Sequence, residues 1–183
     1  MKHSGTVPLQ TERLTLRPFR TDDAAAMFKN WTNDDEVSKF LRWPTHESIE
    51  ISEAVARDWE SHNSDSDFYQ WAICLQGNEP IGSIGVVEQN ERTKMLHIGY
   101  CIGRKWWRQG ITSESLAAVI RYLFTTTDVN RIESLHDPLN PNSGRVMVKC
   151  GMKYEGTMRQ ADFSNQGICD AAMYSILREE YQF

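Results

Sequence analysis

A basic stretch with one glycine, from Lys105 to Glu114, carries the residues best suited to hold a phosphate. Gly110 lets the backbone turn sharply and approach a ligand without a Cβ in the way. Apolar residues then recur at helical spacing, so the stretch would lie at the start of a helix: Leu116, Val119, Ile120, Leu123 and Phe124. The first turn of a helix has unpaired backbone N–H groups and partial positive charge, which suit a phosphate. An ordinary helix start is the alternative, and these residues alone leave both open.

His97 and Cys101 are the next pair that could do chemistry, as the base and nucleophile of a hydrolase. On a strand the two would share a face, but four residues at about 3.3 Å each separate them by roughly 13 Å. That is far beyond hydrogen-bond reach, which argues against a Cys-His hydrolase. His97 alone could still act as a base, because an unperturbed imidazole titrates at about pH 6.5. A histidine on the sheet surface without a role is the alternative.

The cysteines and histidines do not form a metal-binding pattern. The four cysteines contain no C-x-x-C pair, and the five histidines are scattered. We therefore predict no metal, and we expect the thiols to be reduced and to fill apolar surroundings.

Length and charge restrict the class of protein. A chain of 183 residues with a 40% apolar and 25% charged composition is typical of one soluble globular domain, here residues 1–183. The net charge of −5 argues against a general binder of nucleic acid or of anionic membranes. Apolar runs of membrane-spanning length and an apolar signal-peptide core are both missing, which predicts a cytoplasmic protein.

The hydrophobic patterns predict a mixed α/β (α+β) domain in the order strand, helices, three strands, helix, strand, helix, two strands. The strands are expected at 11–17, 69–75, 81–88, 94–102, 131–135, 154–158 and 171–177, with turns at 76–78 and 89–91. Beside the helix that follows Gly110, helices are expected at 24–31 with Thr21 as its cap, at 34–41, from Thr45 or Ser48 to about His62, and at 142–149. Gly151 would end the last of these.

Four stretches of the chain resemble the GNAT family of acetyl-CoA-dependent N-acetyltransferases, and within it the ribosomal-protein N-terminal (RimJ/RimL-type) branch. They follow in order and cover almost the whole chain: 11–17, similar to the branch's "TERLxLR" start; 98–102 with 107–114, its strand and pyrophosphate loop; 137–143 with 149–156, its "N-x-x-S … EKxGFxxEG" segment; and Asp170 with 174–180, its ending. Each motif alone is loose, and together they are specific.

The resemblance implies a single GNAT-like domain with a mixed, mostly antiparallel, twisted sheet of about seven strands flanked by helices. It implies direct transfer of an acetyl group from acetyl-CoA to a primary amine, either a protein N-terminus or a small molecule. The alternative is a catalytically weak acyl-CoA-binding sensor on the same fold. The expected partners are acetyl-CoA and an amine acceptor, without nucleic acid or membrane. The oligomeric state stays open, with a homodimer as the expectation from the branch.

The resemblance also assigns the cofactor contacts. Backbone N–H groups of one loop would hold the CoA pyrophosphate: Trp107, Arg108, Gln109, Gly110, Ile111, Thr112 and Ser113. Only Gly110 matches the superfamily pattern strictly. The backbone of Tyr100, Cys101 and Ile102 would pair with the pantetheine amides like an added half-strand.

Catalytic roles follow from the same resemblance. Ser143 lies where the branch places a hydroxyl near the CoA sulfur, as donor to the departing thiolate, although a helix cap is also open to it. The Asn140 amide would contact the cofactor or be a turn residue. His97 stands where relatives often carry a glutamate, which favours a general base. The alternative carboxylates are Glu88 and Glu133, with Asp162 and Asp170 as weaker ones.

The acceptor side is expected in the segment 31–62. Five of its residues would form a partly aromatic wall, although aromatic residues in such a segment are more often core: Trp31, Phe40, Trp43, His46 and Trp59. The acidic net charge fits a cationic acceptor.

Overall fold

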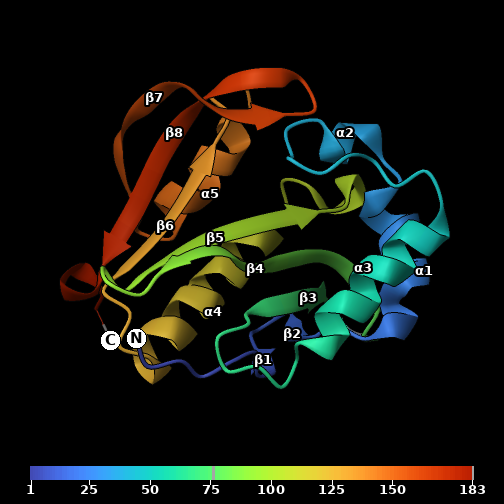
Figure 1. Cartoon of the computed structure of the whole chain (residues 1–183), viewed down its shortest axis with the longest axis horizontal. Helices are drawn as coiled ribbons and strands as arrows, with labels where there is room; N and C mark the ends of the chain where they lie inside the picture. The colour runs from blue at the N-terminus through green and yellow to red at the C-terminus, as the bar shows by residue number, and fades with distance from the viewer. Residues whose placement is uncertain (76, 183) are drawn as a thin grey trace.

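One twisted sheet organises the molecule, which is represented by a computed structural model that describes residues 1–75 and 77–182 (Figure 1). Within these residues the sheet has eight strands in the order β1-β2-β3-β4-β5-β6-β8-β7, all antiparallel except for the parallel pair β5 and β6. The strands are β1 Leu9–Gln10, β2 Thr15–Pro18, β3 Gln70–Cys74, β4 Pro80–Asn90, β5 Met95–Ile102, β6 Arg131–His136, β7 Lys153–Ser164 and β8 Gly167–Leu177. The mixed, mostly antiparallel sheet is confirmed.

The number of strands and the bounds of four of them differ from the sequence prediction. The strand expected at 11–17 begins only at Thr15, and the additional strand β1 has two residues, too few for an alternation to be recognised. The turn expected at 89–91 comes later, because β4 runs to Asn90. Strands β7 and β8 extend beyond the predicted ranges, since most of β7 is exposed and shows no hydrophobic alternation. Gln76 of the other predicted turn lies outside the described residues.

Helices cover both faces of the sheet (Figure 1). On one face lie α1 Ala24–Met27, a π-helical turn Phe28–Thr32, and α3 Ile49–Ser61, with α2 Asp35–Ser38 near the edge. On the other face lie α4 Ile111–Thr126 and α5 Pro141–Lys149. Short 3-10 helices are formed by Thr21–Asp23, Arg104–Trp106 and Arg178–Glu180.

Alternation along the strands divides the core between these two faces. Trp71 and Ile73 of β3 and Ile98 of β5 pack in the cluster that includes α4, whose five residues at helical spacing are all buried. Ala72 and Cys74 point the other way, into the cluster of Phe19 and the helices α1 and α3. Consecutive residues of β5 therefore face different helices, which decides the layout of the site described below.

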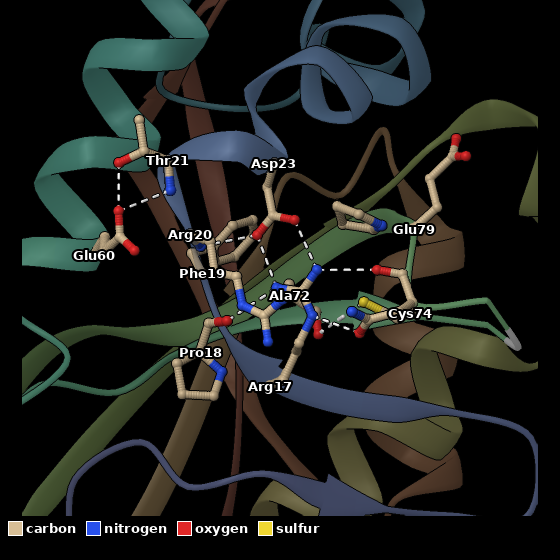
Figure 2. Close-up of polar contacts among 12 residues, drawn as sticks. Arg17, Pro18, Phe19, Arg20, Thr21, Asp23, Glu60, Ala72, Cys74 and Glu79 are labelled. Atoms are coloured by element: carbon tan, nitrogen blue, oxygen red, sulfur yellow. Dashed lines mark hydrogen bonds and ion pairs between the residues drawn. The ribbon is translucent and has the colours of Figure 1, made fainter.

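Two polar contacts fix the start of the first helix (Figure 2). Thr21 is not its cap: the residue lies inside a 3-10 turn, and its hydroxyl and amide donate to Glu60 of α3. Arg17 is buried although the alternation of β2 would expose it, because Nη1 and Nη2 donate to the Asp23 carboxylate at 2.8 and 2.7 Å. The hydrogen bond to Asp23 is the main reason that the pKa of Arg17 is raised. Its Nε also donates to Asn78 at 2.7 Å, so one side chain joins β2, the first helix and the β3–β4 turn.

Candidate active site

The sheet opens between its two parallel strands. Pairing of β5 with β6 ends at His97 and Glu133, whereas β5 stays paired with β4 as far as Ile102. The Ser134 hydroxyl donates to the Ile98 carbonyl at 2.7 Å, in the place where the next backbone contact would lie. Residues 98–102 therefore present a strand edge that, within the described part of the chain, is not paired with a strand on the β6 side. A cavity of about 1090 Å³ lies at this opening.

The loop before α4 has the backbone of an anion site. Gly110 adopts φ +76° and ψ 0°, and Arg108 also has positive φ, at +61°. The first helical hydrogen bond runs from the Glu114 N–H to the Gly110 carbonyl, at 3.0 Å. The N–H groups of Ile111, Thr112 and Ser113 precede it and are left for a ligand.

Six of the seven predicted loop residues line the cavity: Trp107, Arg108, Gly110, Ile111, Thr112 and Ser113. The side chain of Gln109 folds back instead, and its amide donates to the Lys105 carbonyl at 3.0 Å. Trp107 is anchored by its indole N–H, which donates to the Ile102 carbonyl at 2.9 Å. The indole contact ties the loop to the end of β5.

A brace from the N-terminal segment holds this loop, and sequence reasoning missed it. Arg13 donates through Nη1 to the Gln109 carbonyl at 3.0 Å and through Nε to Glu114 at 2.7 Å. The Thr11 hydroxyl donates to the same carboxylate at 2.6 Å. Burial opposes ionisation of Glu114, but the hydrogen bonds from Thr11 and Arg13 outweigh it and lower the pKa of Glu114. The available signal was the Thr-Glu-Arg run, which the sequence analysis interprets as part of a strand and as a family motif but not as a contact of this loop.

Tyr100 and Ser143 meet across the opening, on the α5 side of the sheet. The Tyr100 hydroxyl donates to the Ser143 carbonyl at 3.0 Å and lies 3.1 Å from the Ser143 hydroxyl. Burial raises the pKa of Tyr100, so the side chain remains a phenol that can donate a hydrogen bond. Ser143 lies inside the first turn of α5 rather than at its cap, which is Asn140, whose side chain makes no capping hydrogen bond. Both Asn140 and Ser143 line the cavity.

His97 lines the same cavity from the opposite face of β5. Its side chain is buried, and Nδ1 lies 3.4 Å from Oε1 of Glu133. A carboxylate only accepts, so Nδ1 carries the hydrogen and Nε2 is the basic nitrogen. The other Glu133 oxygen accepts from Arg131 Nε at 2.6 Å. The hydrogen bond with His97, followed by that with Arg131, lowers the pKa of Glu133.

The alternative carboxylates are less well placed than His97 for taking a proton in the cavity. Glu133 has both oxygens engaged, as described above. Glu88 pairs with His97 in the β4–β5 register but is exposed and does not line the cavity. Asp162 lines the cavity in an ion pair with Arg42 at 2.7 Å, and Asp170 accepts from the Gln160 N–H at 2.8 Å.

Further cavity residues come from the segment 31–62 and from β5. The five side chains of the expected aromatic wall all line the cavity: Trp31, Phe40, Trp43, His46 and Trp59. The Cys101 sulfur lies 3.3 Å from the Ser83 hydroxyl, and burial raises the pKa of the thiol, which makes Cys101 a poor nucleophile.

Among the described residues, groups of three or more metal-binding side chains do not occur, and the helices are all too short or too polar to cross a membrane.

Comparison with known proteins gives the family. The model of the acetyltransferase (GNAT) domain matches residues 13–153. The uncharacterized N-acetyltransferase YoaA of Bacillus subtilis is 31% identical over 171 residues, which cover 93% of this chain and 96% of that protein. The ribosomal-protein-serine acetyltransferase of Escherichia coli is 30% identical over 103 residues, 56% of this chain and 58% of that protein. One similar solved structure is RimL, a ribosomal α-N-protein acetyltransferase in complex with coenzyme A. It has a TM-score of 0.83 at 22% identity, and the match covers 93% of this chain and 98% of the RimL chain.

The family match and the similar N-acetyltransferase therefore define this chain as an N-acetyltransferase. The chain belongs to the acetyltransferase (GNAT) domain family.

Proposed function

We propose that the protein transfers the acetyl group of acetyl-CoA directly to a primary amine. The observation that carries the proposal is the gap between β5 and β6, which has an anion-binding loop and Ser143 on one side and His97 on the other. Structural relatives with this fold bind coenzyme A or acetyl-CoA, which supports the choice of ligand.

The residues at the gap fit acetyl-CoA. The pyrophosphate would accept hydrogen bonds from the N–H groups at the start of α4, with Arg108 and Lys149 as nearby positive charges lining the cavity. A side chain at Gly110 would be strained by the positive φ and would stand beside this cradle. The pantetheine amides would pair with the free edge of β5 at Tyr100, Cys101 and Ile102, and the Asn140 amide would contact the same ligand.

The thioester would then lie at the gap, with the acceptor amine arriving from the His97 face. His97 Nε2 takes a proton from the ammonium, directly or through water, and the free amine attacks the carbonyl carbon. As the C–N bond forms, the C–S bond breaks and the electron pair stays on sulfur. The Ser143 hydroxyl donates a hydrogen bond to this thiolate, and Tyr100 orients Ser143 from behind. The products are an N-acetyl amine and the free thiol of CoA, because the amine's second proton passes to the sulfur.

Glu133 acts in this scheme as a positioning residue for the base. Its carboxylate fixes the proton on Nδ1 of His97 and is itself held by Arg131. The arrangement leaves Nε2 as the site that accepts the amine proton.

An acetylation panel tests the proposal. The protein is incubated with acetyl-CoA and peptides or small amines, while thiol release and the acetylated product are followed by absorbance and mass spectrometry. The proposal predicts one acetylated amine for each CoA released. Tight binding of acetyl-CoA without acetylation of any amine would instead support the acyl-CoA sensor, and failure to bind acetyl-CoA would contradict both.

A further inference from the structure

We propose that the acceptor is a small amine with a second positive charge, and that the carboxylate of Asp137 binds this charge. The inference rests on the proposed function and names the acceptor class of that same cavity. The structural basis is a buried carboxylate oxygen of a cavity residue, Oδ2 of Asp137, which has no hydrogen-bond partner among the residues that the structure describes.

Asp137 follows the last residue of β6 and lines the cavity. The residue is only 6% exposed. Its Oδ1 accepts from the Leu139 N–H at 2.9 Å, whereas its buried Oδ2 accepts no hydrogen bond from the described residues. A buried carboxylate in this condition is costly, and a bound cation would offset the cost.

The surrounding side chains do not supply a positive charge for Asp137. Asp137 has no basic side chain within ion-pair distance among residues 1–75 and 77–182. The neighbouring carboxylate, Asp162, is already neutralised by Arg42 at 2.7 Å. Both carboxylates are close to Cys169: burial first, then the charges of Asp137 and Asp162 and a hydrogen bond with the Asp137 carboxylate, raise the pKa of its thiol. A thiol is a weak donor without positive charge, so it does not neutralise Asp137. One of the two negative charges at this wall is therefore uncompensated.

The position of Asp137 fits an acceptor rather than the cofactor. His136, the preceding residue, faces α5, because a Cβ on Gly144 would lie 2.5 Å from its ring nitrogen Nε2. Asp137 is instead close to Cys169, which the pairing of β5, β6 and β8 puts on the same face of the sheet as His97. The amine would therefore be deprotonated near His97 while a second ammonium group lies at Asp137.

The wall beside Asp137 is closed, which favours a small acceptor. Asn165, in the turn between β7 and β8, donates its backbone N–H to the Leu41 carbonyl at 3.1 Å. Its side-chain amide donates to the carbonyls of Ser38 and Trp43, each at 2.8 Å. These bonds and the Arg42–Asp162 pair join the hairpin to the segment after α2, where the two lie side by side (Figure 1). A folded protein would have to break this contact to enter from that side.

The test compares two amines that differ only in the second charge, diaminobutane and butylamine. The parent should acetylate diaminobutane with the higher kcat/KM. Asp137→Asn keeps the acceptor for the Leu139 N–H but loses the charge, and it should reduce this preference about tenfold to a hundredfold, mainly through KM. The same exchange at exposed Asp67, which does not line the cavity, is the matched control and should keep the parental preference.

Two results would overturn the inference: a parent that does not prefer the diamine, or an Asp137→Asn variant that keeps the preference with an unchanged melting temperature. Calorimetry separates this inference from the proposed function, because it needs no turnover. Diaminobutane should bind the CoA-saturated parent and bind Asp137→Asn at least about tenfold more weakly, even if neither amine is acetylated. If the parent does not bind diaminobutane, the inference is wrong, whereas acetylation of other amines would leave the proposed function standing.

Discussion

Replacing Gly110 by valine should separate ligand binding from folding at the loop before α4. Gly110 has φ +76°, and a Cβ built there would meet only the Arg13 guanidinium, at 3.5 Å. The fold therefore has room for the side chain, and the cost is backbone strain of about 1–3 kcal/mol. For a domain of this size the melting temperature should fall by about 2–12 °C. The added branch would stand where the backbone must approach phosphate, so calorimetry should show CoA affinity reduced at least about tenfold.

Gly151 provides the matched control for this prediction. It has φ +82° after α5, and a Cβ there would meet only Ile176, at 3.7 Å. Gly151 does not line the cavity. Gly151→Val should therefore lose a similar amount of stability and keep the parental CoA affinity. The reasoning is refuted if Gly110→Val binds CoA as tightly as the parent, or if both variants weaken binding equally.

Three further changes test separate parts of the account. Ser143→Ala should lower kcat by about a hundredfold or more and change the dissociation constant of acetyl-CoA little, because the hydroxyl acts as sulfur gains charge; unchanged turnover in a steady-state assay would exclude that role. Arg17→Met leaves the Asp23 carboxylate buried without its partner, and denaturant unfolding should show a loss of about 3–5 kcal/mol; a loss below about 1 kcal/mol would show that the pair contributes little. The hydrogen bond from Arg131 lowers the pKa of Glu155 to about 2. The contribution of ionised Glu155 to the free energy of unfolding is therefore full above the unfolded pKa of about 4.3 and is lost as the pH falls toward 2. Since the Glu155 side chain is 42% exposed, that contribution is about 1 kcal/mol or less, and Glu155→Gln should differ from the parent at neutral pH but not near pH 2.

Local patterns were enough to predict the elements that carry the site. The helical spacing after Gly110 identified α4, and the runs 81–88 and 94–102 identified β4 and β5, because each pattern is a local consequence of which face is buried. Alternation along β5 also contained the information that His97 and Tyr100, three residues apart, face opposite sides.

Contacts between distant segments could not be predicted in the same way. Tyr100 meets Ser143 from 43 residues away, and Arg13 reaches Glu114 from 101 residues away. Neither pair leaves a periodic signal, because each depends on how strands and helices pack in space. The burial of Arg17 had the same origin, since the pattern along β2 does not contain Asp23 and Asn78.

The central claim is that an amine deprotonated by His97 takes the acetyl group of acetyl-CoA across the gap between β5 and β6. The most direct measurement is the rate of acetylated-amine formation and CoA release against pH, for the parent, His97→Ala and His97→Glu on the best acceptor found. The account predicts equal amounts of the two products and a parental rate that rises as an imidazole loses its proton. It predicts a loss of about a hundredfold or more with that limb missing in His97→Ala, and partial recovery with the limb at lower pH in His97→Glu. CoA release without an acetylated amine, or a His97→Ala profile that matches the parent, would contradict it.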